Sequence, residues 1–140
     1  MAKGSNDRLE HARHNDKALK HFDRSQEFLD WVITVAFYPS LHYVKYVLFP
    51  FEETLPNKVL HSHQNFDAYY RFYKYRGLNK HERLLELVTE KLPEIAFEYN
   101  QLKDMCWTAR YIDYKTDRAM SNLARKHQKT IKDFCDPKED

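Results

Sequence analysis

The sequence predicts an all-α fold, an up-and-down bundle of about five helices, and two observations favour it. The 140 residues include only two glycines and five prolines, whereas a sheet protein needs turn residues about every eight to twelve positions. Apolar residues instead recur at helical spacing over long stretches. The same scarcity of glycine excludes glycine-rich phosphate loops, dinucleotide-binding fingerprints and nucleophile elbows. A chain of this length is expected to form one domain, residues 1–140, with 1–5 disordered and 136–140 a polar tail.

The first half of the chain contains three expected helices and one loop. An asparagine or aspartate near residue 6 caps a helix that ends at about residue 22. The next helix, over about residues 26–48, is apolar on most sides, so it is expected to be the central helix that the others surround. A proline-bounded loop then continues to about residue 61. Ser62 is the expected N-cap of a helix over 63–76, which Gly77 ends.

The second half contains two further helices. Asn79 caps a helix whose apolar stripe continues on both sides of Pro93. Pro93 either opens a new helix or kinks one long helix that reaches about residue 111, and the continuous period favours the kinked helix. Asp113 or Thr116 opens the last helix. Its basic residues gather on the face opposite the apolar one, as solvated faces commonly do: Arg118, Arg125, Lys129 and Lys132.

The charge and the cysteine content restrict the environment and the partners. Lys and Arg number 23 against 21 Asp and Glu, which leaves a net charge of +2. Bulk charge therefore does not identify a nucleic-acid binder, and any such claim depends on local clustering. Two cysteines, no signal peptide and no apolar run long enough to cross a bilayer indicate a reduced, cytoplasmic protein without a membrane partner.

Four polar residues interrupt the apolar second helix at intervals of four: Asp30, Thr34, Tyr38 and His42. Residues at this spacing stack along one side of a helix, and a buried aspartate or histidine needs a partner. Arg110 is the expected partner, because its helix must pack near the centre, and His63 could join the set. The set is interpreted either as an acid–base site or as a satisfied hydrogen-bond network that fixes the helix register.

Several histidines have the spacing of metal ligands. His61 and His63 form an H-x-H pair, His63 and Asp67 are four residues apart on the expected third helix, and His11 and His14 form another pair. A carboxylate-bridged site in a bundle uses Glu-x-x-His pairs, which this chain lacks, and it has no Cys-x-x-Cys. We therefore expect no metal and no other cofactor.

The segment from Tyr69 to Arg76, YYRFYKYR, interleaves aromatic and basic residues. Such a pattern can stack bases and hold phosphates, which makes Arg71 and Arg76 candidate RNA contacts. On a helix these residues point in all directions. About half of them are therefore expected in the core, and the rest on an amphipathic or partner-facing surface.

The run from Asp30 to Val44, DWVITVAFYPSLHYV, resembles the pattern DWAVTxxFYAALHYV of small prokaryotic HEPN-type helical proteins. A histidine after the following loop, His61 or His63, is also similar to that group, as is the later segment from residue 99 to residue 111. The resemblance implies an up-and-down helical bundle that is often dimeric. It also implies RNA binding or metal-independent RNA cleavage in toxin–antitoxin, CRISPR or phage-defence systems, or a non-catalytic role beside a nucleotidyltransferase.

Ribonuclease members of that group carry an Arg-x(4–6)-His motif, and two stretches match it: Arg8 to His14 and Arg76 to His81. The expected function is that of an RNA-associated, HEPN-like homodimer of a prokaryotic defence or stress system. The alternative is a non-enzymatic module that dimerises or binds a protein partner. If the protein is a metal-independent endoribonuclease, the expected catalytic residues are the general acid–base His42, the phosphate clamp Arg110, and the orienting residues Tyr38 and Asp30. Accessory RNA contacts are then expected from His63, Arg71, Arg76 and His81.

Overall fold

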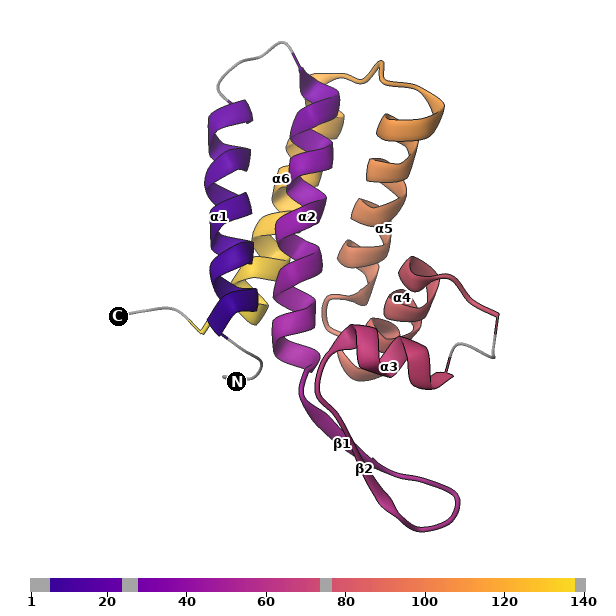
Figure 1. The fold of residues 1–140 in the computed structure, drawn as a ribbon. Coiled ribbons are helices and arrows are strands. Elements are labelled where there is room, and N and C mark those ends of the chain that lie inside the picture. Colours follow the sequence, from indigo (N-terminus) through magenta and orange to yellow (C-terminus); the bar gives the residue numbers. More distant parts are fainter. Residues whose placement is uncertain (1–5, 24–27, 74–76, 138–140) are drawn as a thin grey trace.

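Four helices form an up-and-down bundle, and a smaller unit is inserted between the second and third of them. The structure is a computed structural model that describes residues 6–23, 28–73 and 77–137. Successive bundle helices run in opposite directions (Figure 1): α1 (Asn6–Asp23), α2 (Leu29–Leu48), α5 (Ala96–Trp107) and α6 (Arg118–Cys135). The inserted unit contains a β-hairpin followed by α3 (Phe66–Tyr73) and α4 (Lys80–Lys91). The prediction of a mostly helical fold is confirmed, with the hairpin as the exception.

The central position of α2 follows from its composition. Apolar residues cover most of its circumference, and it packs against α1, α5 and α6. Each large apolar side chain contributes about 1.5–3 kcal/mol when it is fully buried, so α2 supplies a large part of the stabilising free energy. Its buried apolar residues are Val32, Ile33, Ala36, Phe37, Tyr43, Val44, Tyr46, Val47 and Leu48. The prediction of a central helix is confirmed.

The segment predicted to be a proline-bounded loop forms a β-hairpin instead. β1 (Phe51–Thr54) pairs antiparallel with β2 (Leu60–His63). The Lys58 N–H closes the turn by donating to the Leu55 carbonyl at 2.8 Å. Lys58 has a φ of 67°, the left-handed conformation that a short hairpin turn commonly contains. Each strand has only four residues, which is too few for an alternating apolar pattern to stand out in the sequence.

The start of the helix predicted over 63–76 also changes. Residues 60–63 belong to β2, so α3 begins only at Phe66. Its cap is Asn65 rather than Ser62, because the Asn65 Oδ1 accepts a hydrogen bond from the backbone N–H three residues further on, at 2.8 Å. The cap predicted at Asn79 is confirmed, with the same bond at 2.9 Å.

The predicted long helix from residue 79 to about residue 111 is wrong. α4 ends at Lys91 and α5 begins at Ala96, so the segment contains two helices with a turn at Pro93. A proline lacks the N–H that a continuous helix needs and its ring crowds the preceding turn, which explains the break. This part of the chain therefore forms two helices where one was predicted, and only the second of them, α5, belongs to the bundle.

The end of α5 and the start of α6 are both built by local hydrogen bonds. α5 passes into a single π-helical turn, η2 (Thr108–Ile112), in which the Asp113 N–H donates to the Thr108 carbonyl at 2.9 Å. The cap of α6 is Asp117, whose side chain accepts from the Met120 N–H at 2.9 Å, rather than Asp113 or Thr116. The last helix thus begins slightly later than predicted.

Two predictions concern the ends of the chain. Residues 1–5 and 138–140 lie outside the described residues. The disorder predicted for residues 1–5 therefore stays a prediction. The start of the predicted polar tail is held by an ion pair: Arg13 donates to both carboxylate oxygens of Asp136, at 2.7 and 3.2 Å.

Within the described ranges, every helix is too short or too polar to cross a lipid bilayer.

Candidate functional site

The four polar residues of α2 do not face one site. Tyr38 lies beside α5 and η2, whereas His42 faces α1. Asp30 and His42 are twelve positions apart, and at about 100° and 1.5 Å per residue they are roughly 120° and 18 Å apart on an ideal helix. An i, i+4 stripe drifts around a helix in this way, so the predicted juxtaposition of His42 with Arg110 does not occur.

The predicted pairing of Asp30 with Arg110 is present. The Nη1 atom of Arg110 lies 3.9 Å from the Oδ2 atom of Asp30, and both side chains are partly buried. The guanidinium also lies over the Trp31 ring, 4.0 Å from its centroid, in a cation–π contact. These two contacts hold the Arg110 side chain where α2 meets η2.

Arg110 lines a cleft of about 410 Å³ between α2, the start of α4, and α5 with η2. Two of its aromatic residues are well exposed: Trp107 by 57% and Tyr111 by 71% of the residue surface. Their ring centroids are 4.6 Å apart. The cleft thus combines exposed rings with two cations, Lys103 and Arg110, and two carboxylates, Glu82 and Asp104. Its lining residues are Phe37, Tyr38, Asn79, His81, Glu82, Lys103, Asp104, Cys106, Trp107, Arg110 and Tyr111.

Three titratable groups in the cleft, His81, Tyr38 and Cys106, are neutral at neutral pH. Burial lowers the pKa of His81, and the positive charges of Lys103 and Lys45 lower it further, so the imidazole is neutral. Burial raises the pKa of Tyr38, which keeps the phenol protonated. Burial also raises the pKa of the Cys106 thiol to about 11, so it is not a thiolate nucleophile. The cleft therefore offers a neutral base, a protonated phenol and the fixed charge of Arg110.

His42 belongs to a separate cluster between α1 and α2. Its Nδ1 accepts a hydrogen bond from Arg8 at 3.0 Å, and its ring stacks on His11 with the centroids 3.8 Å apart. Burial, together with the nearby His11, Arg8 and Lys45, lowers the pKa of His42 to about 4. His42 is 8% exposed and packs as a neutral ring in the α1–α2 interface.

This pKa predicts a pH-dependent stability. The unfolded state binds a proton near pH 6.5 and the folded state only near pH 4, so the stabilisation present above pH 6.5 is lost as the pH falls towards 4. A His42→Asn variant keeps an acceptor for Arg8 and cannot be protonated. Between pH 7.5 and 5.5, the wild type should lose about 1 kcal/mol more unfolding free energy than this variant, measured by urea denaturation. Equal losses in the two proteins would contradict the assignment.

The other predicted accessory residues are dispersed. His63 is 1% exposed and lies against Phe51 and Tyr69, with its Nε2 on the Glu53 carboxylate, which also accepts from the Tyr73 hydroxyl at 2.7 Å. These two hydrogen bonds outweigh the effect of burial and lower the pKa of Glu53. His63 is thus part of the hairpin–α3 core. Arg71 is exposed on α3, and Arg76 lies outside the described residues.

No group of three or more His, Cys, Asp or Glu side chains suited to holding a metal ion occurs among residues 6–23, 28–73 and 77–137.

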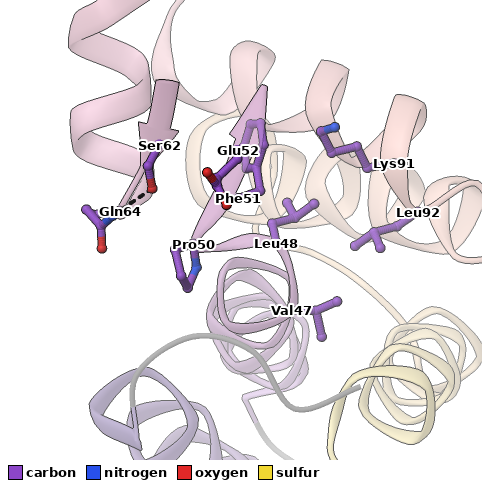
Figure 2. Close-up of a pocket in the computed structure, with 9 residues that line it drawn as sticks. All are labelled: Val47, Leu48, Pro50, Phe51, Glu52, Ser62, Gln64, Lys91 and Leu92. Atoms are coloured by element: carbon purple, nitrogen blue, oxygen red, sulfur yellow. Dashed lines mark hydrogen bonds between the residues drawn. The ribbon is translucent and has the colours of Figure 1, made fainter. Parts of the chain in front are cut away.

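A larger cavity, of about 630 Å³, lies at the base of the hairpin (Figure 2). Its apolar walls include Val47, Leu48 and Leu92. Three of its polar side chains, Ser62, Gln64 and Lys91, already interact with one another or with a ring. Gln64 donates to the Ser62 hydroxyl at 2.7 Å, and the Lys91 ammonium lies 4.5 Å from the Phe51 ring centroid. These groups do not converge on a common point, so the α2–α4–α5 cleft is the stronger candidate.

No protein-family model, curated protein or solved structure matches this chain. The resemblance to HEPN-type proteins therefore stays a prediction from the sequence. The expectations of a homodimer and of a protein partner stay predictions in the same way.

Proposed function

We propose that the protein is an RNA-associated, HEPN-like domain that binds single-stranded RNA in the α2–α4–α5 cleft. The observation that carries the proposal is the position of two exposed rings, Trp107 and Tyr111, on either side of Arg110 in the sequence and beside it in the cleft. Exposed aromatic rings stack on unpaired bases, and arginine and lysine bind the phosphates between them. The resemblance to proteins that bind or cut RNA supports the same assignment.

The polar lining fits a single strand better than a purely apolar ligand. Lys103 adds a second cation to Arg110 and bonds to Asp104 at 3.0 Å, so a phosphate would have to compete with that carboxylate for it. The exposed Glu82 carboxylate supplies acceptors for the exocyclic amino groups of bases. A volume of about 410 Å³ lies within the range of ordinary ligand pockets. In a duplex the base faces are hidden, so the rings of the cleft would have nothing to stack on.

Trp107→Ala tests the proposal. Loss of one base–aromatic stack costs about 1–3 kcal/mol, so affinity for a labelled 12-nucleotide single-stranded RNA should fall about 5- to 100-fold in fluorescence anisotropy. Phe97→Ala is the matched control, because Phe97 is a similarly exposed ring (66%) at the other end of α5. Equal affinity of the wild type and Trp107→Ala, or an equal loss in the control, would contradict binding in the cleft.

A second candidate function is metal-independent cleavage of the bound RNA, and the grouping of His81, Tyr38 and Arg110 in one cleft favours it. The neutral His81 can remove the proton of a ribose 2′-hydroxyl, whose oxygen then attacks the adjacent phosphorus. The bond to the 5′ oxygen breaks as Tyr38 donates a proton to it, which leaves a 2′,3′-cyclic phosphate and a 5′-hydroxyl. In this proposal Arg110 stabilises the charge of the transition state. Incubation of RNA with the protein in EDTA tests for these products.

A further inference from the structure

The positive charge of this chain is concentrated on one helix. α6 contains five Lys and Arg residues and one Asp, a net charge of +4, whereas the whole chain carries +2. The rest of the chain is therefore slightly acidic. The cationic residues of α6 are a local cluster of positive charge that the net charge of the chain does not show. None of them lines the α2–α4–α5 cleft.

The cations of α6 border a groove of about 460 Å³ between α1 and α6. Five cationic residues line it: Lys20, Arg125, Lys126, Lys129 and Lys132. Two carboxylates lie among them. Asp16 is buried and accepts from Gln128 and from Lys132, each at 2.9 Å, and the Lys20 ammonium lies 3.8 Å from the same carboxylate. Asp133 accepts from Lys129 at 2.9 Å. The groove therefore keeps a net positive charge after both carboxylates are counted.

We propose that this groove binds the phosphate backbone of a nucleic acid without contacting its bases. From Arg125 to Lys132 the cations extend about 10 Å along α6, and Lys20 supplies positive charge from α1. No aromatic ring is among the described residues that line the groove. Phosphate contacts alone carry no sequence information, so the groove should accept double-stranded RNA, whose bases are hidden.

The groove is separate from the α2–α4–α5 cleft. Figure 1 shows α1 and α5 on opposite sides of α2, with α6 crossing behind α2. The lining of the groove comes from α1 and α6, and the lining of the cleft from α2, α4 and α5 with η2. Duplex binding in the groove can therefore be tested independently of single-strand binding in the cleft.

A second copy of the chain is the main competing occupant, because α4 carries a row of acidic residues, Glu82, Glu86 and Glu90. The structure favours the nucleic acid over this contact. Glu86 is already bound by the guanidinium of Arg83, and Glu82 lies at the α2–α4–α5 cleft. Arg83 thus offsets one of the three glutamates, which leaves the row with less negative charge than the groove has positive charge.

The test compares the wild type with Lys126→Glu/Lys129→Glu on a blunt-ended 16-base-pair RNA duplex, by fluorescence anisotropy at 50 to 200 mM KCl. We expect affinity to fall at least about tenfold and the slope of log Kd against log salt to decrease by about 2. Lys126→Gln/Lys129→Gln repeats the measurement in case the glutamates disturb α6. The control, Lys58→Glu/Lys115→Glu, changes the total charge equally at two exposed positions, in the hairpin turn and in the loop before α6.

Three results would overturn the proposal: no duplex binding by the wild type, an equal loss in the control, or salt-sensitive self-association that replaces duplex binding and disappears in Lys126→Glu/Lys129→Glu. The last result would assign the groove to a second copy of the chain. Trp107→Ala should bind the duplex as the wild type does. The experiments therefore distinguish a failure of the duplex-binding proposal for the groove from a failure of the single-strand-binding proposal for the cleft.

Discussion

His81→Ala is expected to slow metal-independent RNA cleavage by about 100- to 10,000-fold, the usual contribution of a positioned general base. The reason is that His81 is the histidine that lines the cleft beside Arg110, whereas His42 is bound by Arg8 between α1 and α2. The rate should rise with pH through the lowered pKa of His81 and level off above it, because only the neutral imidazole accepts a proton. Single-turnover cleavage of a labelled RNA in EDTA measures both effects.

Two controls test whether the loss of activity is specific to His81 and to attack by the 2′-hydroxyl. His14→Ala removes an exposed histidine of α1 and should leave the cleavage rate unchanged. An RNA in which one ribose lacks its 2′-hydroxyl should not be cut at that position, since the attacking oxygen is absent. Activity that survives His81→Ala, or that needs a divalent metal, would exclude the proposed chemistry while leaving RNA binding to be judged by the Trp107→Ala variant.

Asp16→Ala is expected to lower the free energy of unfolding by about 2–3 kcal/mol. The buried Asp16 carboxylate joins α1 to α6 through Gln128 and Lys132, and its loss leaves the buried Gln128 amide without that acceptor. The effect should lie below that of a fully buried ion pair, because Lys132 can turn towards water. Urea denaturation monitored by circular dichroism measures the change.

Asp133→Ala is the matched control for this stability effect. Asp133 accepts from Lys129 on the exposed face of α6, at the same 2.9 Å as the Lys132–Asp16 contact. An exposed pair of this kind contributes at most about 1 kcal/mol and commonly less than half of that. Equal losses in the two variants would show that burial of Asp16 does not strengthen the α1–α6 contact.

The main features of the bundle were predictable because they depend on long patterns. The apolar circumference of α2 extends over many residues, so its central position could be read from the sequence. The Asn79 cap was equally clear, since asparagine before a helix has a specific bonding role. The hairpin was not predictable in this way, because four-residue strands leave too short a pattern and the turn depends on the conformation of Lys58.

The candidate site was predictable only in part because it is assembled from three elements. Arg110 and its partner Asp30 were identified, since a buried carboxylate requires a nearby cation. The prediction that His42 lies beside Arg110 was wrong, because residues spaced by four shift gradually around α2 and His42 therefore faces α1. Trp107 and Tyr111 were not predicted, although on the helix expected to reach residue 111 the spacing of three and four residues from Trp107 puts Arg110 and Tyr111 on its face.

Photo-crosslinking locates the bound RNA on the protein. A single-stranded RNA that contains 4-thiouridine would be irradiated with the wild-type protein, and the crosslinked peptides identified by mass spectrometry. We expect the crosslinks to fall on the rings of the α2–α4–α5 cleft: Tyr38, Trp107 and Tyr111. Crosslinks confined to the α1–α6 groove or to the hairpin, with none in the cleft, would contradict the proposal that this cleft binds single-stranded RNA.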